Sequence, residues 1–476
     1  MFLGGCRSAS EAHLAFLNAA ASLRALDPAA NVPVLSVLPT VGESRGLAGL
    51  FEAQRNLDLL HEHARRLGAA SPQAAAEGSL ERGGRICFIE NDFAPSQPEE
   101  AVLEGLRKNP DDAGLRHVYA DMLLERGDER GELINLNLRP LTWERITRAG
   151  EIERRLIGDL ERKLGVKIGI GFYFKGGFLS GISIEEPTKQ AVEGLFESLD
   201  GPFIRDLEIR NADGAEWILA LAQSPHASNL KRLSLVNTGL GVEGILALAR
   251  CRLASLTNLH LSSNGIGEEG ARALARFPYL SKLTTLELWN ENIGAEGARA
   301  LAGSPYLSVV TTLRLMGNHI RDEGLRALAQ SPLHSKLAIL ELWNENIGVD
   351  GVRALVQSSL FAKLRTLNLT GNVFGPDGAR ALARPPHPSN LVTLGLPHCG
   401  IGDEGAEALA DSRHLSKVES LYLSSNEIGD AGARALAQPS AYLNLRVLDL
   451  MFNRIGAEGA QALRESPFLS RIWVKT

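Results

Sequence analysis

The stretch LELWNENIGAEGARALA, residues 286–302, decides the fold of this chain. It returns almost unchanged as LELWNENIGVDGVRAL from Leu340, and looser copies fill much of the 476-residue sequence. Each copy predicts a short strand, a tight turn and a helix of small residues. Self-similarity with a period of roughly 20–50 residues is typical of solenoid proteins.

The period becomes regular when one strand leucine in each copy is taken as an anchor. Neighbouring anchors are separated by 26 residues in the first two steps and by 27 in all later steps. The ten anchors are Leu207, Leu233, Leu259, Leu286, Leu313, Leu340, Leu367, Leu394, Leu421 and Leu448. A unit of this size cannot bury its own apolar face, so neighbouring units must stack. Because helices are wider than strands, we predict an α/β horseshoe with an inner parallel sheet and outer helices.

The shared pattern L-x-L-x-x-N-x-I-G-x-E-G-A-x-A-L resembles the ribonuclease-inhibitor type of leucine-rich repeat over residues 207–469. The resemblance implies that the Asn caps backbone groups of the turn after the strand, as it does in that family. Five units match it, with Asn264, Asn318, Asn372, Asn426 and Asn453. Four units depart from it, with Thr238, Glu291, Glu345 and Cys399. At the two Glu positions, we expect the flanking Asn290, Asn292, Asn344 and Asn346 to substitute.

Residues 98–140 predict a small helical unit. A first helix stops at Asn109-Pro110, Asp111 or Asp112 caps a second, and Asp128 caps a third. The segment YADMLLERGDERGELI, residues 119–134, resembles the repeat-companion domain that precedes leucine-rich repeats in planctomycete and related bacterial proteins. The resemblance implies lineage and domain order more than chemistry. We interpret the acids Asp121, Glu125, Asp128 and Glu132 as caps and ion-pair partners of the neighbouring arginines.

The rest of the chain is organised around these two segments. Residues 1–97 are Ala-rich and predict poorly defined helices and a linker. Residues 141–206 predict a connecting helix and a capping turn, in which Leu179, Ile182 and Ile184 keep the spacing of the later strands. Residues 207–476 form the repeat array. A further strand would begin near Trp473, and its open edge could pair two copies into a dimer, although we expect a monomer.

Composition narrows the functional classes. The net charge is −6 and there is no long Lys/Arg run, so we expect no nucleic-acid partner. No apolar run approaches the roughly 18 residues of a membrane-spanning helix. The four cysteines lie far apart without metal-binding spacing, which favours free thiols, a reducing compartment and a cytoplasmic location. We expect no metal and no cofactor.

Two rows of residues should line the concave face of the sheet. Trp289, Met316 and Trp343 occupy the same position in three consecutive units, so we expect them to form a contiguous exposed apolar stripe. Packing of the core does not require large apolar residues at this position. Beside it lie Glu287, Arg314 and Glu341, and Tyr422 follows farther along the same row. Aromatic and Met anchors with Arg nearby are typical of interface hot spots. The charged row is also compatible with ordinary cross-strand pairing, and duplication of one repeat would copy a Trp without selection.

These patterns favour a non-enzymatic protein–protein interaction scaffold that binds a partner protein on the concave face. No Walker loop, GxSxG, HExxH or Cys–His arrangement occurs in the sequence. Two alternatives stay open. The array could select substrates for an enzyme whose catalytic part lies in the first 200 residues, or it could inhibit a signalling protein.

Overall fold

The computed structural model describes residues 97–475 except 141, 170, 213–215, 332–335, 439–443 and 471–472. The helices expected within residues 1–96, and the thiols of Cys6 and Cys87, lie outside the described residues. The described chain divides into two compact units. The first comprises residues 97–163 with 173–179, and the second comprises residues 164–172 with 180–475.

The first unit consists mainly of four helices. They are α3 (Gln97–Lys108), α4 (Ala113–Glu125), α5 (Glu129–Asn137) and α6 (Trp143–Leu164). Strand β2 (Tyr173–Lys175) and the first two residues of β3 (Phe178–Glu185) complete it. Helix α6, which we expected in the connecting segment, is thus grouped with the shorter helices before it.

Short polar side chains set the helix boundaries in this unit, as the sequence predicts. Asp112 accepts a hydrogen bond from the Leu115 N–H and caps α4, and Asp128 accepts from the Arg130 N–H and caps α5. The carboxylate of Glu132 pairs with Arg148 at 2.7 Å. These contacts confirm the structural interpretation of Asp128 and Glu132.

Other residues of the segment 119–134 divide between core and surface. Tyr119 is fully buried and stacks on Phe178, with ring centroids 5.8 Å apart. Arg126 holds the buried Glu99 through two hydrogen bonds of 2.6 and 2.8 Å. Asp121 and Glu125 are exposed and make no ion pair within the described residues, so the expectation of caps or pairs is wrong for these two.

The second unit is the repeat array, and its strands pair in the register that the anchors predict. Its sheet runs β1-β3-β4 and onward in chain order to β14, with β1 (Lys167–Ile168) antiparallel to β3 and the later pairs parallel. The anchor strands are β4 (Asp206–Arg210), β5 (Arg232–Val236), β6 (Asn258–Ser262), β7 (Thr285–Trp289), β8 (Thr312–Met316), β9 (Ile339–Trp343), β10 (Thr366–Asn368), β11 (Thr393–Gly395), β12 (Ser420–Tyr422) and β13 (Val447–Asp449). Neighbouring anchors lie opposite one another from Leu207 to Leu448.

Each end of this sheet carries a less regular strand. In β3, Ile182 lies opposite Leu207 and Ile184 lies opposite Ile209, so the degenerate spacing seen in the sequence does form a strand of the array. At the other end, β14 (Trp473–Lys475) pairs with β13 and places Val474 opposite Leu448.

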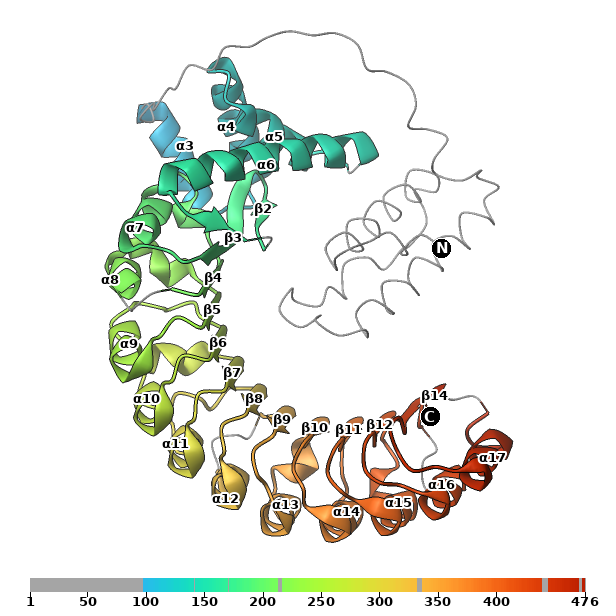
Figure 1. The fold of residues 1–476 in the computed structure, drawn as a ribbon. Helices are drawn as coiled ribbons and strands as arrows, with labels where there is room; N and C mark the ends of the chain where they lie inside the picture. Colours follow the sequence, from blue (N-terminus) through green and yellow to red (C-terminus); the bar gives the residue numbers. More distant parts are fainter. Residues whose placement is uncertain are drawn as a thin grey trace, which may run out of the picture. The chain divides into compact units, whose positions relative to one another are not determined.

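Helices cover the outer side of the array. They are α7 (Lys189–Glu197), α8 (Glu216–Gln223), α9 (Gly241–Leu248), α10 (Gly267–Leu274), α11 (Gly294–Ala302), α12 (Arg321–Gln330), α13 (Val349–Val356), α14 (Gly375–Ala383), α15 (Gly402–Ala410), α16 (Asp430–Ala437) and α17 (Ala457–Glu465). Figure 1 shows strands β4–β13 along the inner side of this unit and helices α8–α17 along its outer side. The predicted concave sheet and convex helices are therefore confirmed.

The core of the array lies between the sheet and the helices. Every anchor leucine is at most 2% exposed. The constant glycine near each helix start lets the helix approach its neighbour. At Gly297, for example, an added Cβ would lie 2.8 Å from the Ile293 Cβ and 3.0 Å from the Ala271 Cβ, closer than packed carbons come.

Candidate functional site

The sheet register places the predicted stripe on three neighbouring strands. Trp289 at the end of β7 lies opposite Met316 at the end of β8, and Met316 lies opposite Trp343 at the end of β9. All three side chains are half-buried, so the stripe is less exposed than the sequence led us to expect. Neighbouring side chains cover part of the surface, as the His260 ring does over Trp289 at 4.5 Å between centroids.

The exposed part of the two indoles is apolar. The Nε1 atoms of Trp289 and Trp343 are buried, and neither donates a hydrogen bond to a described residue. The surface that these side chains show to solvent is therefore ring carbon. A buried N–H without a partner costs about 1–3 kcal/mol, so the position of these rings lowers the stability of the folded chain.

An ion-pair row borders the stripe. The Arg314 guanidinium donates from Nη1 to Glu287 Oε1 at 2.6 Å and from Nε to Glu341 Oε2 at 3.0 Å. The three side chains are only 13–18% exposed. Arg314 is thus clamped between the two carboxylates, which fixes its side chain and leaves this row with one net negative charge.

Tyr422 does not join this cluster. It lies on β12, opposite Gly395 and Asp449, and strands β10 and β11 separate it from β9. At about 4.8 Å per strand, three steps correspond to about 14 Å. The structure therefore brings together six of the seven predicted partner-binding residues and leaves Tyr422 apart.

Two buried glutamates next to the stripe were not predicted. Glu291 and Glu345 are 0% exposed and occupy the turn position at which other repeats carry Asn. The Glu345 carboxylate accepts from the backbone N–H groups of Asn318 at 2.9 Å and Ile320 at 3.0 Å. Glu291 accepts likewise from Asn264 and Ile266.

The expectation that flanking asparagines would replace these caps is wrong. Asn290, Asn292, Asn344 and Asn346 are exposed and adopt left-handed backbone with φ between 54° and 58°. The Glu side chain reaches the same N–H groups itself, because its two oxygens can each accept from one of them. The sequence feature that could have predicted this role is the position of each Glu in the repeat, two residues after a Trp.

Glutamate and asparagine differ chemically in this turn. Asn318 donates from Nδ2 to the Leu288 carbonyl at 2.7 Å, and an ionised glutamate has no proton for such a bond. Burial raises the pKa of Glu345 to about 7, although the backbone N–H groups of Asn318 and Ile320 act in the opposite direction. Burial also raises the pKa of Glu291. These two carboxyls are therefore sensitive to pH in a way that the asparagines are not.

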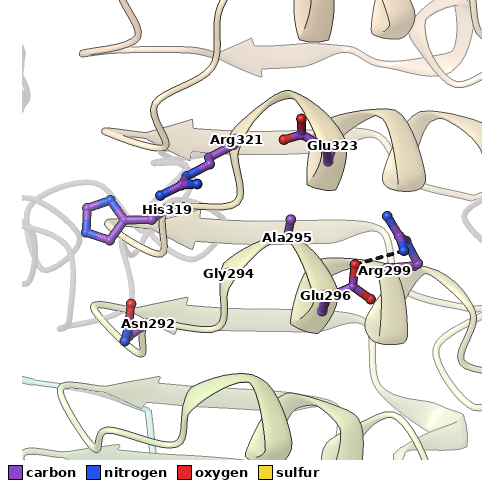
Figure 2. A pocket seen from close by; sticks show the side chains of 8 residues that line it. All are labelled: Asn292, Gly294, Ala295, Glu296, Arg299, His319, Arg321 and Glu323. Carbon is purple, nitrogen blue, oxygen red and sulfur yellow. Dashed lines mark ion pairs between the residues drawn. The ribbon is translucent and has the colours of Figure 1, made fainter.

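A shallow depression of about 450 Å³ lies beside the turns that follow β7 and β8. Its lining residues are Asn292, Gly294, Ala295, Glu296, Arg299, His319, Arg321 and Glu323. Figure 2 shows the Arg321 side chain extending toward His319, whereas Glu296 pairs with Arg299 away from them at 2.8 Å. Within the depression, Arg321 and His319 thus lie apart from the Glu296–Arg299 ion pair.

The repeat pattern matches a known family model. The model described as "Leucine Rich repeat" matches residues 226–249, 252–275, 306–329, 362–383, 387–410, 414–437 and 443–463. The chain carries leucine-rich repeats. Together with the parallel strand series and the outer helices, this match makes the second unit a leucine-rich repeat solenoid of mixed α/β class.

Several solved structures resemble the chain at low identity. A chain in the crystal structure of the Rad7 and Elc1 complex in yeast is 15% identical, with 80% of this chain and 98% of that chain covered and a TM-score of 0.41. An internalin (InlF) from Listeria monocytogenes is 14% identical, with 67% and 93% covered and a TM-score of 0.39. A protein from Bacteroides fragilis is 15% identical, with 69% and 83% covered and a TM-score of 0.33. A search of curated proteins found no significant match.

Two further features of the described residues bear on the site. None of the described helices combines the length and the apolar character that a bilayer crossing needs. In the same part of the chain, no group of three or more His, Cys, Asp or Glu side chains is arranged to hold a metal ion.

Proposed function

We propose that the leucine-rich repeats form a non-enzymatic scaffold that binds a partner protein on the concave face. The contact centres on Trp289, Met316 and Trp343, with Glu287, Arg314 and Glu341 along one border. The observation that carries the proposal is the register that sets these three large apolar side chains side by side on β7, β8 and β9. Solenoids commonly bind through such extended concave surfaces.

The energetics of the stripe support binding. Its side chains are half-buried, so a partner would remove the remaining apolar surface from water at about 25 cal/mol per Å². Trp is among the residues that contribute most to interface hot spots. Arg314 is already held by two carboxylates, so little side-chain entropy is lost there when a partner docks.

We favour a scaffold over the recognition part of an enzyme. Strongly perturbed acids are often catalytic when they lie in a cleft. In this array the perturbed Glu291 and Glu345 are fully buried and bind turn N–H groups, which is a structural role. Inhibition of a signalling protein is a second candidate that would use the same face, and the identity of the partner distinguishes it from a general scaffold. Tyr422 would contact only a partner that extends well beyond the stripe.

Lineage and location are part of the proposal. We assign residues 98–140 to a bacterial repeat-companion domain, 141–206 to a connecting and capping segment, and 207–476 to repeats of the ribonuclease-inhibitor type. Buried Tyr119 and the capping role of Asp128 support the first assignment, and the 26–27-residue units support the last. The free, buried thiols of Cys251 and Cys399 agree with a reducing cytoplasm.

The proposal is tested by affinity capture from the native host with the purified chain as bait. Changing Trp289 and Trp343 together to Ala should reduce capture of the partner, identified by mass spectrometry, by at least tenfold. A matched control changes Leu219 and Leu246 to Ala, because both are 42% exposed on outer helices. Melting curves of both double variants establish that they are folded. Undiminished capture by a folded Trp double variant would refute binding at the stripe.

A further inference from the structure

The repeat anchored at Leu313 departs from all its neighbours at one turn position. Eight residues after the anchor, the other repeats from Leu233 to Leu448 have glycine, namely Gly241, Gly267, Gly294, Gly348, Gly375, Gly402, Gly429 and Gly456. This repeat has Arg321 instead. The backbone of Arg321 is left-handed, with φ of 59°, the same conformation as Gly294 at 60° and Gly402 at 59°.

The fold does not need an arginine here. The Arg321 N–H donates to the Glu345 carbonyl at 3.0 Å, just as the Gly294 N–H donates to the Asn318 carbonyl at 3.0 Å. The Arg321 side chain is exposed and makes no hydrogen bond or ion pair with any described residue. A residue with a Cβ is disfavoured in left-handed backbone, so Arg321 strains this turn. No hydrogen bond or ion pair between its side chain and a described residue offsets that strain. Observed strain of this kind is a reason to look for a function.

The guanidinium of Arg321 makes its end of the depression cationic, and an imidazole lies beside it. His319 lies two residues earlier, is exposed, and also adopts left-handed backbone with φ of 57°. Figure 2 shows the Arg321 guanidinium directed toward it. Of the nearby acids, Glu296 is paired with Arg299 at 2.8 Å, and Asp322 accepts from the Gly348 N–H at 2.7 Å. Glu323 lies on the helix side of the depression, away from His319.

This cationic end is close to the apolar stripe. His319 follows Met316 by three residues, and an extended chain of that length spans at most about 11 Å. Arg321 is five residues from Met316, which limits the separation to about 18 Å. Both distances fit within the footprint of one standard interface, which buries about 800 Å² on each partner.

We propose that His319 and Arg321 receive an Asp or Glu side chain of the protein that occupies the stripe. This inference rests on the proposed function and specifies its partner: the bound segment is apolar over Trp289, Met316 and Trp343, and acidic where it crosses the turns. A planar guanidinium suits a carboxylate because it can donate two parallel hydrogen bonds. The opposite border of the stripe carries Glu287 and Glu341, which repel an acid. The two borders therefore fix the orientation of the partner.

The cationic end is tested with a defined probe, a terminally blocked hexaglutamate peptide, added to the full chain. Binding is followed by NMR of the histidine rings, with the His319 signal assigned from the His319→Gln variant. Hexaglutamate should shift this signal saturably, and Arg321→Gly should weaken binding at least fivefold. Arg326→Gln is the matched control, because it removes an exposed charge from the same helix, α12, and should leave binding unchanged.

Arg321→Gly also separates function from stability. Glycine relieves the left-handed strain, so the melting temperature should equal or exceed that of the unchanged chain. A lower melting temperature, equal binding of hexaglutamate to Arg321→Gly, or equal binding of a hexaglutamine peptide would each overturn the inference. Tighter binding of inorganic phosphate or of a single-stranded oligonucleotide than of hexaglutamate would overturn it in favour of a different anion.

The same variants distinguish this inference from the proposed function. The Trp289/Trp343 double variant should retain hexaglutamate binding while it loses the partner. If Arg321→Gly instead captures the partner undiminished while the Trp double variant does not, binding at the stripe is supported and the contact between Arg321 and an acidic side chain is refuted. Loss of hexaglutamate binding in the Trp double variant would show that the two surfaces are not separate, which would contradict the arrangement proposed here.

Discussion

Glu345 occupies a turn position that asparagine fills in five other repeats, yet it preserves the turn. Its two oxygens accept the N–H groups that a single Asn oxygen accepts elsewhere, as Asn372 Oδ1 does from Glu345 and Ile347 at 3.0 Å. What it cannot reproduce when ionised is the bond from Asn372 Nδ2 to the Leu342 carbonyl. Protonation restores a donor. The residue therefore links the geometry of one turn to the pH of the medium.

This link predicts a pH dependence of stability. Burial raises the pKa of Glu345 to about 7 in the folded chain, from an ordinary value of 4.5. The folded state thus binds the proton more tightly than the unfolded state does. The resulting stabilisation is fully present below pH 4.5 and is lost as pH rises through 7, with a magnitude on the order of 1–3 kcal/mol. Denaturant unfolding of wild type and Glu345→Gln at pH 5 and pH 8 measures it.

The Gln variant should lose less stability than wild type between these two pH values. Glu323→Gln, which changes an exposed acid in the neighbouring repeat, serves as the control and should keep the wild-type slope. Equal pH dependence in wild type and Glu345→Gln would contradict the assignment. In that case the backbone N–H groups would hold the carboxylate ionised despite its burial.

At the scale of whole elements, much of the fold could be predicted from the sequence. Each anchor leucine must face the core, so a constant period fixes both the strands and their register, as the pairing from Leu207 to Leu448 shows. Details of the site could not be predicted in the same way. The coverage of Trp289 depends on the packing of His260 from the adjacent strand, and the cap at Glu291 depends on reach and burial. The repeat period determines neither of these two contacts.

Contacts between helices of neighbouring repeats also could not be predicted from the repeat pattern of the sequence. Asp403 near the start of α15 accepts from the Gly429 N–H at 2.6 Å and the Gly432 N–H at 2.8 Å. Gly429 is the N-cap of α16, and glycine has no side-chain oxygen with which to cap the helix. An aspartate in one repeat thus caps the first turn of the next helix, and Asp430 does the same for α17 through Gly456 and Gly459.

Asp403→Ala should therefore destabilise the α15–α16 contact by about 1 kcal/mol, the usual cost of losing an N-cap. Thermal unfolding gives the overall effect, and hydrogen exchange in α16 gives the local one. Glu404→Ala is the matched control, because that neighbouring side chain is 68% exposed and its loss should change stability by less than about 0.5 kcal/mol. Similar effects of the two substitutions would exclude a specific cap between repeats.

At the scale of the whole array, the stripe lies on the last three of the longer strands, β7, β8 and β9. Strands β4–β9 have five residues each, whereas β10–β14 have three. The Glu287–Arg314–Glu341 row links β7, β8 and β9, and the buried glutamates tie their turns together. Because each repeat is stabilised mainly by its immediate neighbours, these local differences should persist as differences in local stability. A rigid binding face needs little ordering on association.

Native-state hydrogen exchange can measure this gradient across the array. Amides of β7, β8 and β9 should exchange more slowly than those of β12, β13 and β14, because β7 and β8 pair over five residues with both neighbours and β9 does so with β8, whereas β12, β13 and β14 pair over three. Replacing Arg314 with Gln should raise exchange in β7–β9 and leave β12–β14 unchanged, since it removes only the central ion pairs. If the C-terminal strands were equally protected, the stripe would not be preorganised relative to the rest of the sheet. Its affinity for a partner would then have to come from contact area alone.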